Sequence, residues 1–271
     1  MNRVLLESAE IAEGVATFGG ARAEHVRNVL HGTVGQVIRT GELNGKIGTG
    51  EIVEITERQV TVRIRHTDEP LGPWVDLILA PPRPRILKRL LPQLATLGVG
   101  RIFLVGAQKV EKDFWGATLL KEENYRPLFV DGLMQGCVSS LLPTVETRRN
   151  FRRFVADELD ALFPTATRLV AHPYGGDARP LDCGRDKPAP PERDGFGEDA
   201  GGTRLSRPGL DGRLLLAIGP EGGWTDEEVE LLEAHGFVRH SLGARILRTD
   251  TATLALLARL MPKDEGVRAR T

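Results

Sequence analysis

The N-terminal part of the chain alternates hydrophobic and polar positions over short runs. Residues 36–43, 48–56 and 58–66 are rich in Val, Ile and Thr, and glycine, asparagine or polar turns separate them. This alternation predicts β-strands with one buried face, and several such strands with no helix between them predict a small β-barrel. Just before them, Val26, Val29 and Leu30 are spaced to lie on one side of a short predicted helix.

The pattern changes at Trp74. Residues 74–80 form a continuous apolar run, as in a strand buried on both faces of a parallel sheet. Leucines at helical spacing follow in 85–99, and a second apolar run follows in 100–107. This strand-helix-strand order predicts an α/β domain. Pro92 is expected to end or kink the first helix nearby.

Beyond this unit, the same reasoning predicts helices at 122–137 and 146–164 and a strand at 167–173. The two patterns divide the chain into domains at 1–69 and 74–271, with a linker at 65–73, and 271 residues are enough for two cores. Pro, Gly, Asp and Arg dominate at about 182–212, where apolar residues are few. We expect an exposed, disordered insertion there.

Composition narrows the class of protein. The chain is 41% hydrophobic and 27% charged, as in soluble globular proteins, and no apolar run approaches the roughly 18 to 20 residues that cross a bilayer. Acidic residues near the start replace the apolar core of a secretory signal, so we expect a cytoplasmic protein without membrane contact. Cys137 and Cys183 belong to no Cys/His cluster, which predicts reduced thiols and no metal site.

The charge pattern leaves nucleic-acid binding open. A net charge of −1 argues against nonspecific binding over the whole surface. Basic residues gather at 83–89 and at 148–153. Taken alone, each of these runs favours a solvated face over a binding site.

Residues 214–237 predict a strand, a glycine-rich turn and a helix. Thr225 and Glu228 form a predicted capping box at the start of the helix. The carboxylates at 226–228 occupy the helix end where a phosphate would bind, and the glycine spacing matches no phosphate-binding motif. The turn therefore predicts either a site for an uncharged group such as adenine and ribose, read by backbone amides and carbonyls, or a tight turn with no ligand.

Residues 240–260 repeat this design. Gly243 marks a turn, Arg245 and Arg248 bracket an apolar pair, and Thr249 or Asp250 is expected to cap a final helix. Two glycine-containing turns before helices, with arginines between them, predict a shared pocket at strand ends.

These segments, "IGPEGGWTDEEVELLEAHGF" and "SLGARILRTDTA", resemble in order and spacing the signature of SPOUT-class methyltransferases that make N3-methyluridine in 16S ribosomal RNA of the small subunit. The N-terminal "HVRNVLHGTVGQVI" is similar to that family's PUA-like RNA-binding barrel. The resemblance implies an α/β SPOUT domain with a trefoil knot that binds S-adenosylmethionine, and a homodimer. It assigns these residues to the cofactor: His172, Pro173, Ile218, Gly219, Pro220, Glu221, Gly222, Gly223, Leu242, Gly243, Ile246 and Leu247. For His172, a strand-end side chain without a site role is the simpler interpretation.

The sequence departs from the family on the predicted substrate side. Gln93 and Thr96 stand where the family has a lysine and a glutamate, and Asp250 stands where a glutamate is more frequent. Gln135 is retained as a substrate-side candidate, whereas Asp131 replaces a glutamate. Ser139 or Ser140 replaces an arginine. These changes indicate a divergent branch.

The resemblance also suggests roles in the reaction. Arg245 and Arg248 are candidates for stabilising charge on the uracil or for holding a phosphate, and Asp250 for orienting an arginine, accepting the N3 proton or capping the helix. Candidate RNA contacts in the N-terminal domain are Arg22, Arg27, Arg63 and Arg65, with Arg39 and Lys46 beside them. Two other interpretations remain: a SPOUT enzyme acting on transfer RNA or another ribosomal position, and a non-catalytic RNA-binding or assembly protein.

Overall fold

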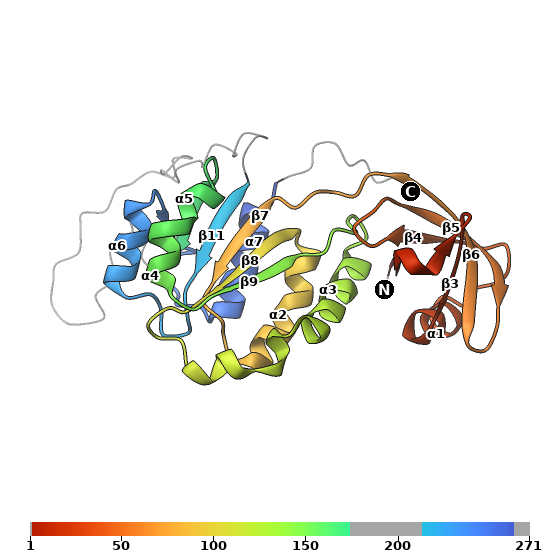
Figure 1. Ribbon diagram of the computed structural model, residues 1–271, viewed down its shortest axis with the longest axis horizontal. Coiled ribbons are helices and arrows are strands. Elements are labelled where there is room, and N and C mark those ends of the chain that lie inside the picture. The colour runs from red at the N-terminus through yellow and green to blue at the C-terminus, as the bar shows by residue number, and fades with distance from the viewer. Residues whose placement is uncertain (1, 174–212, 263–271) are drawn as a thin grey trace, which may run out of the picture.

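The computed structural model describes residues 2–173 and 213–262 (Figure 1). The predicted insertion and Cys183 lie outside these residues. Within them, the strands form two six-stranded sheets, which we call the N-terminal and the C-terminal sheet. No helix in the described ranges is long and apolar enough to cross a membrane.

The N-terminal sheet has the order β1-β4-β5-β6-β3-β2. Its elements are β1 (Val4–Leu6), η1 (Ser8–Glu10), β2 (Ile11–Ala12), β3 (Val15–Gly19), α1 (Gly20–Asn28), β4 (Val37–Glu42), β5 (Ile47–Ile55) and β6 (Gln59–Asp68). The three strands predicted from alternation are β4, β5 and β6, and they pair in antiparallel fashion. Phe18, Val26, Ile52 and Val62 form part of the core beneath them. The PUA-like character of this sheet stays a prediction.

Two expectations for this region are wrong. Helix α1 ends at Asn28, so Val29 and Leu30 lie past it and are 61% and 39% exposed. The chain turns there because Gly32 N donates to the carbonyl of Val26. Arg65 lies within β6 and not in a linker, since pairing with β5 continues as far as Asp68.

The C-terminal sheet has the order β12-β10-β11-β7-β8-β9, and every neighbouring pair is parallel. Its strands are β7 (Val75–Leu79), β8 (Val99–Val105), β9 (Thr144–Arg148), β10 (Thr167–Ala171), β11 (Leu214–Ile218) and β12 (Val238–His240). Its helices are α2 (Pro84–Thr96), η2 (Lys112–Gly116), η3 (Thr118–Leu120), α3 (Glu122–Gly136), α4 (Phe151–Arg153), the π-helical turn η4 (Phe154–Glu158), α5 (Leu159–Leu162), α6 (Asp226–Ala234) and α7 (Thr249–Leu260). The predicted α/β class with a parallel sheet is confirmed.

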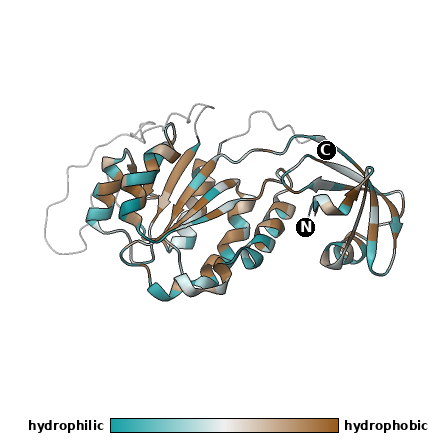
Figure 2. Cartoon of the chain, in the orientation of Figure 1, coloured by the Kyte–Doolittle hydropathy of each residue, from teal (hydrophilic) through white to brown (hydrophobic). Residues whose placement is uncertain are grey.

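Alternate residues of the strands face two separate helix layers, because strand side chains point to opposite faces. Leu77 and Leu216 pack with α2, α3 and α7 on one face. Ile78 and Leu215 pack with α4, α5 and α6 on the other. Figure 2 shows the hydrophobic residues concentrated on the strands between these layers. The continuous apolar runs in the sequence reflect this burial on both faces.

The two helix predictions for this domain have different outcomes. Helix α2 contains Pro92 and ends nearby, at Thr96. Here α3 packs closely on it, since a Cβ on Gly132 would lie 2.0 Å from the carbonyl oxygen of Pro92. The segment predicted as one helix at 146–164 is not a single helix, because its first residues belong to β9, which pairs with β8. The helical part begins at Phe151, where the side chain of Asn150 caps it by accepting a hydrogen bond from Arg153 N.

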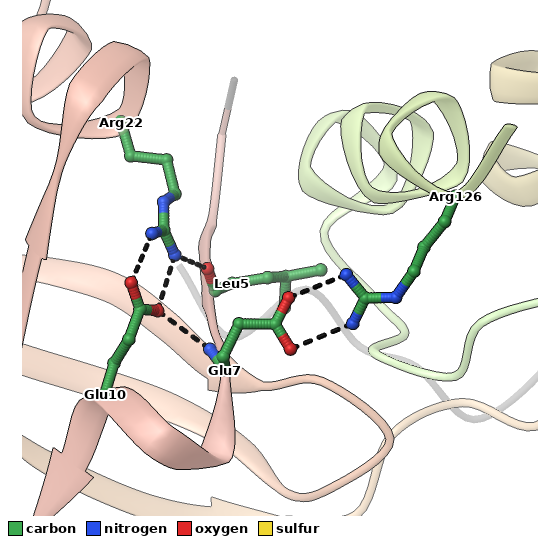
Figure 3. A network of polar contacts seen from close by, with 5 residues as sticks. All are labelled: Leu5, Glu7, Glu10, Arg22 and Arg126. Carbon is green, nitrogen blue, oxygen red and sulfur yellow. Dashed lines mark hydrogen bonds and ion pairs between the residues drawn. The ribbon is translucent and has the colours of Figure 1, made fainter. Parts of the chain in front are cut away.

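The N-terminal sheet is fixed to α3 by polar contacts. Arg3 donates to the carbonyls of Cys137, Thr40 and Gly48 at 2.9, 2.6 and 2.9 Å. The carboxylate of Glu7 binds the guanidinium of Arg126 through two hydrogen bonds (Figure 3). These contacts set the position of the N-terminal sheet against the C-terminal one.

Candidate functional site

Three strands of the C-terminal sheet, β10, β11 and β12, are neighbours, so their carboxyl ends meet at one edge. The segments predicted to bind a cofactor, 172–173, 218–223 and 242–247, follow these three strands. Ser241 Oγ donates to the carbonyl of Pro173 at 2.9 Å, and Thr249 Oγ1 donates to that of Gly219 at 3.4 Å. The structure therefore brings the three segments together, as the crevice rule for parallel sheets predicts.

His172 also belongs to this edge through its backbone. Its N–H donates to the carbonyl of His240 at 3.1 Å, extending the pairing of β10 with β12. Burial lowers the pKa of His240, which keeps this imidazole neutral near pH 7. The backbone of these strand ends is thus held by the sheet.

The glycine-rich turn after β11 needs its glycines. A Cβ on Gly219 would lie 3.0 Å from Cδ1 and Nε1 of Trp224, and Gly223 has a φ of 71°. Trp224 is buried and its ring stacks on Phe151 with centroids 5.1 Å apart. The turn therefore lies directly on a fixed indole, and at Gly219, Gly222 and Gly223 only backbone groups are present to meet a ligand.

Two cations outside the sequence prediction hold the same turn. Lys109 Nζ donates to the carbonyl of Gly222 at 2.9 Å, and Arg83 Nε lies 3.8 Å from Glu221 Oε2. Both come from loops after β7 and β8, far away in sequence. The sequence indicated Arg83 only as part of the basic run at 83–89 and did not indicate Lys109, but parallel strands place their following loops at one edge.

The start of α6 is the predicted capping box. Thr225 Oγ1 accepts from Glu228 N at 3.3 Å, and Glu228 Oε2 accepts from Thr225 N at 2.9 Å. Glu228 is only 3% exposed and its second oxygen accepts from Gln108 N at 2.7 Å. Carboxylates occupy the helix start, so the site suits a neutral or cationic group better than a phosphate.

The turn before α7 differs from its prediction in one respect. Arg248, and not Thr249 or Asp250, occupies the N-cap position of α7, with no side-chain cap. The Asp250 carboxylate instead accepts from Thr251 N at 2.9 Å. Gly243 has a φ of 114°, a conformation that favours glycine.

The side chains of this second turn point outward. Ile246 and Leu247 are 78% and 37% exposed, and Arg245 and Arg248 are exposed as well. Beside them, a groove of about 480 Å³ lies between α2 and α7, with Arg89, Gln93 and Asp250 in its wall. The three predicted catalytic residues therefore share one edge with the cofactor segments.

Other predicted residues lie elsewhere. Gln135 is in the last turn of α3, where its carbonyl accepts from Asn2 Nδ2 at 3.0 Å, next to the N-terminal sheet and away from the strand-end loops. Ser140 is buried and donates to the carbonyl of Gly45. The substrate role of Gln135 stays a prediction. Within the described parts of the chain, no three His, Cys, Asp or Glu residues are grouped to hold a metal ion.

The predicted RNA contacts differ in their surroundings. Arg22 binds Glu10 and the carbonyl of Leu5, inside the network of Figure 3. Arg27 donates to the carbonyl of Thr56 at 3.1 Å. Arg63 lies 3.4 Å from Glu51, and Arg65 is exposed on β6. Arg22 is thus already committed to an internal contact.

The chain resembles known proteins over most of its length. The family model for an RNA methyltransferase domain matches residues 68–261. Ribosomal RNA small subunit methyltransferase E of Treponema pallidum is 29% identical over 264 residues, covering 95% of this chain and 90% of the relative. The enzyme of the same name from Synechocystis is 49% identical over 59 residues, which is 22% of this chain and 20% of the relative.

Solved structures share the fold. That of ribosomal RNA small subunit methyltransferase E from Neisseria gonorrhoeae, bound to S-adenosyl methionine, has a TM-score of 0.68 at 21% identity and covers 96% of both chains. A methyltransferase from Legionella pneumophila in complex with the same cofactor has a TM-score of 0.63 at 25% identity, again covering 96% of both chains.

Proposed function

We propose that this chain, which belongs to the RNA methyltransferase domain family, uses S-adenosylmethionine to methylate N3 of a uridine in 16S ribosomal RNA. One observation carries the proposal. Three strand-end segments converge at one edge of the parallel sheet, tied by the Ser241–Pro173 and Thr249–Gly219 hydrogen bonds. The structural relatives from Neisseria and Legionella bind this cofactor, and the sequence relatives are named for the small-subunit substrate.

The residues present fit this cofactor. Gly219 and Gly223 leave backbone groups at the surface of the turn, where amides and carbonyls can read an adenosine. Carboxylates at 226–228 disfavour phosphate and are compatible with a positive charge nearby. When bound, S-adenosylmethionine supplies an activated methyl group on a sulfonium. The segments 172–173, 218–223 and 242–247 would hold it.

The arginines near this edge would act on the RNA. Removing the N3 proton leaves negative charge on the uracil, and exposed guanidiniums at Arg245 and Arg248 can stabilise it or hold the adjoining phosphate. Asp250, with one carboxylate oxygen engaged by Thr251 N, can accept the proton or orient an arginine. N3 lies on the pairing edge of uracil, so the target has to be unpaired or flipped.

Basic residues on the N-terminal sheet would position the RNA backbone. Cross-strand register places Arg39 and Arg65 on either side of Thr49, and places Arg63 next to Glu51 in the adjoining row. Directly paired residues share a face, so these three arginines line one exposed surface. Such a surface supports phosphate contacts without sequence preference.

The enzyme would act as a homodimer in the cytoplasm, where ribosomes assemble. Exposed Ile246, Leu247 and Met261, together with the groove between α2 and α7, offer apolar surface beside the site. Covering this surface with a second copy would bury it and exclude water from the reacting groups.

Methyl transfer from labelled S-adenosylmethionine tests the function. The acceptors are small ribosomal subunits from a strain that lacks this activity, naked 16S RNA and transfer RNA. The proposal expects label in 16S RNA and none in transfer RNA. Label in transfer RNA, or cofactor binding by calorimetry with no label in any acceptor, would contradict it.

A further inference from the structure

A second cavity, of about 510 Å³, opens at the carboxyl ends of β8 and β9. Its wall includes Gly106 and Gln108 after β8, residues 149–152 after β9, and Glu227 and Glu228 at the start of α6. The predicted cofactor and catalytic residues are not part of this wall. Its volume falls within the roughly 300 to 1,000 Å³ of ordinary ligand pockets.

Arg149 is the available cation of this cavity. The other three arginines of the run are paired: Arg148 with Glu146 and Glu158, Arg152 with Glu227, and Arg153 with Asp157. Within residues 2–173 and 213–262, Arg149 has no carboxylate partner. Its guanidinium lies 5.7 Å from the centroid of the Trp115 ring. A guanidinium free of carboxylates and next to an aromatic ring suits phosphate binding and base stacking.

The backbone of Arg149 is held in place. Gly106 N donates to the carbonyl of Arg148 at 3.0 Å. A Cβ on Gly106 would lie 1.9 Å from the carbonyl oxygen of Arg149, so only glycine permits this approach. The side chain is exposed while its attachment point is fixed, which lowers the entropy that binding would cost.

Two amide side chains border the same space. Asn150 uses its oxygen to accept from Arg153 N at 3.0 Å, which leaves its NH₂ group without a partner among the described residues. Gln108 is exposed, and its backbone N–H is bound by Glu228. Amides offer both donors and acceptors, as the edge of a nucleobase requires. The Arg152–Glu227 pair keeps the cavity from being strongly positive, so it suits one nucleotide better than a polyphosphate.

The cavity shares a wall with the glycine-rich turn. Glu228 accepts from Gln108 N on the cavity side and from Thr225 N on the turn side. Lys109, next to Gln108, donates to Gly222 within the turn. A group bound in this cavity would therefore lie next to the glycine-rich turn.

We propose that this cavity binds one nucleotide of the substrate RNA close to the methylated uridine, with Arg149 on its phosphate and Gln108 and Asn150 facing its base. The inference rests on the proposed function and names a further substrate contact for it. It also gives the basic run at 148–153 a function through one member, Arg149, while the other arginines of the run hold the local structure.

The test compares Arg149→Ala with Arg153→Ala, a matched control in the same run whose arginine is already paired with Asp157. Binding of 16S RNA at several salt concentrations and KM for small subunits are measured for each. Loss of one charge-assisted contact should raise Kd and KM about ten-fold with kcat unchanged. The slope of log Kd against log salt should fall by about 0.7 to 0.9. Arg153→Ala should match the wild type, and Arg149→Lys should recover part of the loss and show that folding is intact.

The outcomes separate this site from the reaction itself. If Arg149→Ala binds RNA with the affinity and salt dependence of Arg153→Ala, the cavity is not an RNA site. If the wild type transfers no methyl group while the difference in RNA affinity persists, the proposed reaction is wrong and the RNA site stands. Unchanged calorimetric affinity for S-adenosylmethionine in Arg149→Ala is expected, and a matching loss of that affinity would overturn the assignment to RNA.

Discussion

Glu7 beside the N-terminal sheet and Arg126 in α3 form two parallel hydrogen bonds, Oε1 to Nη1 at 2.8 Å and Oε2 to Nη2 at 2.9 Å (Figure 3). On its other side, the backbone N–H of Glu7 donates to the carboxylate of Glu10, which binds Arg22. A planar bidentate pair constrains direction as well as distance. The N-terminal sheet is thereby oriented against the helix layer that supports the proposed site.

Glu7→Gln tests this pair through pH. Hydrogen bonds from Arg126 lower the pKa of Glu7 below its ordinary 4.5. The pair therefore stabilises the fold above pH 4.5 and loses this contribution as pH falls through the lowered value. The side chains of Arg126 and Glu7 are 37% and 42% exposed. Glu7→Gln should therefore lower the free energy of unfolding by at most about 1 kcal/mol at pH 7.

Urea unfolding of wild type and Glu7→Gln between pH 3 and 7 measures this contribution. The difference in unfolding free energy should be constant at neutral pH and vanish in acid. Glu123→Gln removes a looser pair with Lys121, at 3.9 Å, and should cost less. A difference that grows as pH falls would show that the Glu7–Arg126 pair does not stabilise the ionised carboxylate.

Gly219→Ala should damage the glycine-rich turn. The new Cβ would lie 3.0 Å from the fixed Trp224 ring, so the turn or the indole has to shift, at a cost of about 1 to 3 kcal/mol. Calorimetry should show weaker binding of S-adenosylmethionine. Gly72→Ala is the control, because no atom of the described residues lies within 4 Å of its Cβ. Unchanged cofactor affinity in Gly219→Ala would remove this turn from the site.

Asp250→Ala separates chemistry from helix stabilisation. Asp250 lies in the first turn of α7, where a carboxylate contributes about 0.3 to 1 kcal/mol through the helix dipole. If it also accepts a proton, kcat should fall about 100-fold with cofactor affinity unchanged. Glu122→Ala, in the first turn of α3, should lose similar stability and keep its kcat. If Asp250→Ala and Glu122→Ala have the same kcat, Asp250 stabilises the helix and takes no part in the chemistry.

Arg65→Ala tests the basic surface of the N-terminal sheet. Arg65 is exposed in the cross-strand row with Arg39, so its loss should weaken RNA binding and lower the salt slope by about 0.7 to 0.9, one phosphate contact. Methyl transfer at saturating RNA should keep its kcat. A variant that binds RNA with wild-type affinity and salt dependence would remove Arg65 from the contact surface.

The sequence predicted what depends on local pattern. Alternation identified β4, β5 and β6, apolar runs identified β7 and β8, and the Thr225–Glu228 spacing identified a capping box that the hydrogen bonds confirm. Each of these features is encoded within a few neighbouring residues. The cofactor segments were located by motif and meet because parallel strands share an edge.

The misses depend on contacts between distant segments. Among the described residues, strand β9 lies at the edge of the sheet and pairs with β8, a contact that the local pattern of its residues, read as part of a helix, did not indicate. Arg22 stays a candidate RNA contact, but the sequence did not indicate that Glu10 and the carbonyl of Leu5 also bind its guanidinium. Lys109 and Arg83 reach the glycine-rich turn from loops that no local pattern connects to it.

The central claim is methylation of uracil N3 in 16S RNA, and the chemical identity of the product tests it most directly. Small subunits from a strain that lacks the activity are incubated with the protein and S-adenosylmethionine, and the 16S RNA is digested to nucleosides for mass spectrometry against synthetic standards. The account predicts one new N3-methyluridine, formed in smaller amount when Gly219→Ala replaces the wild type at limiting S-adenosylmethionine. A methyl group on carbon 5, on a ribose 2′-hydroxyl or on another base would contradict it.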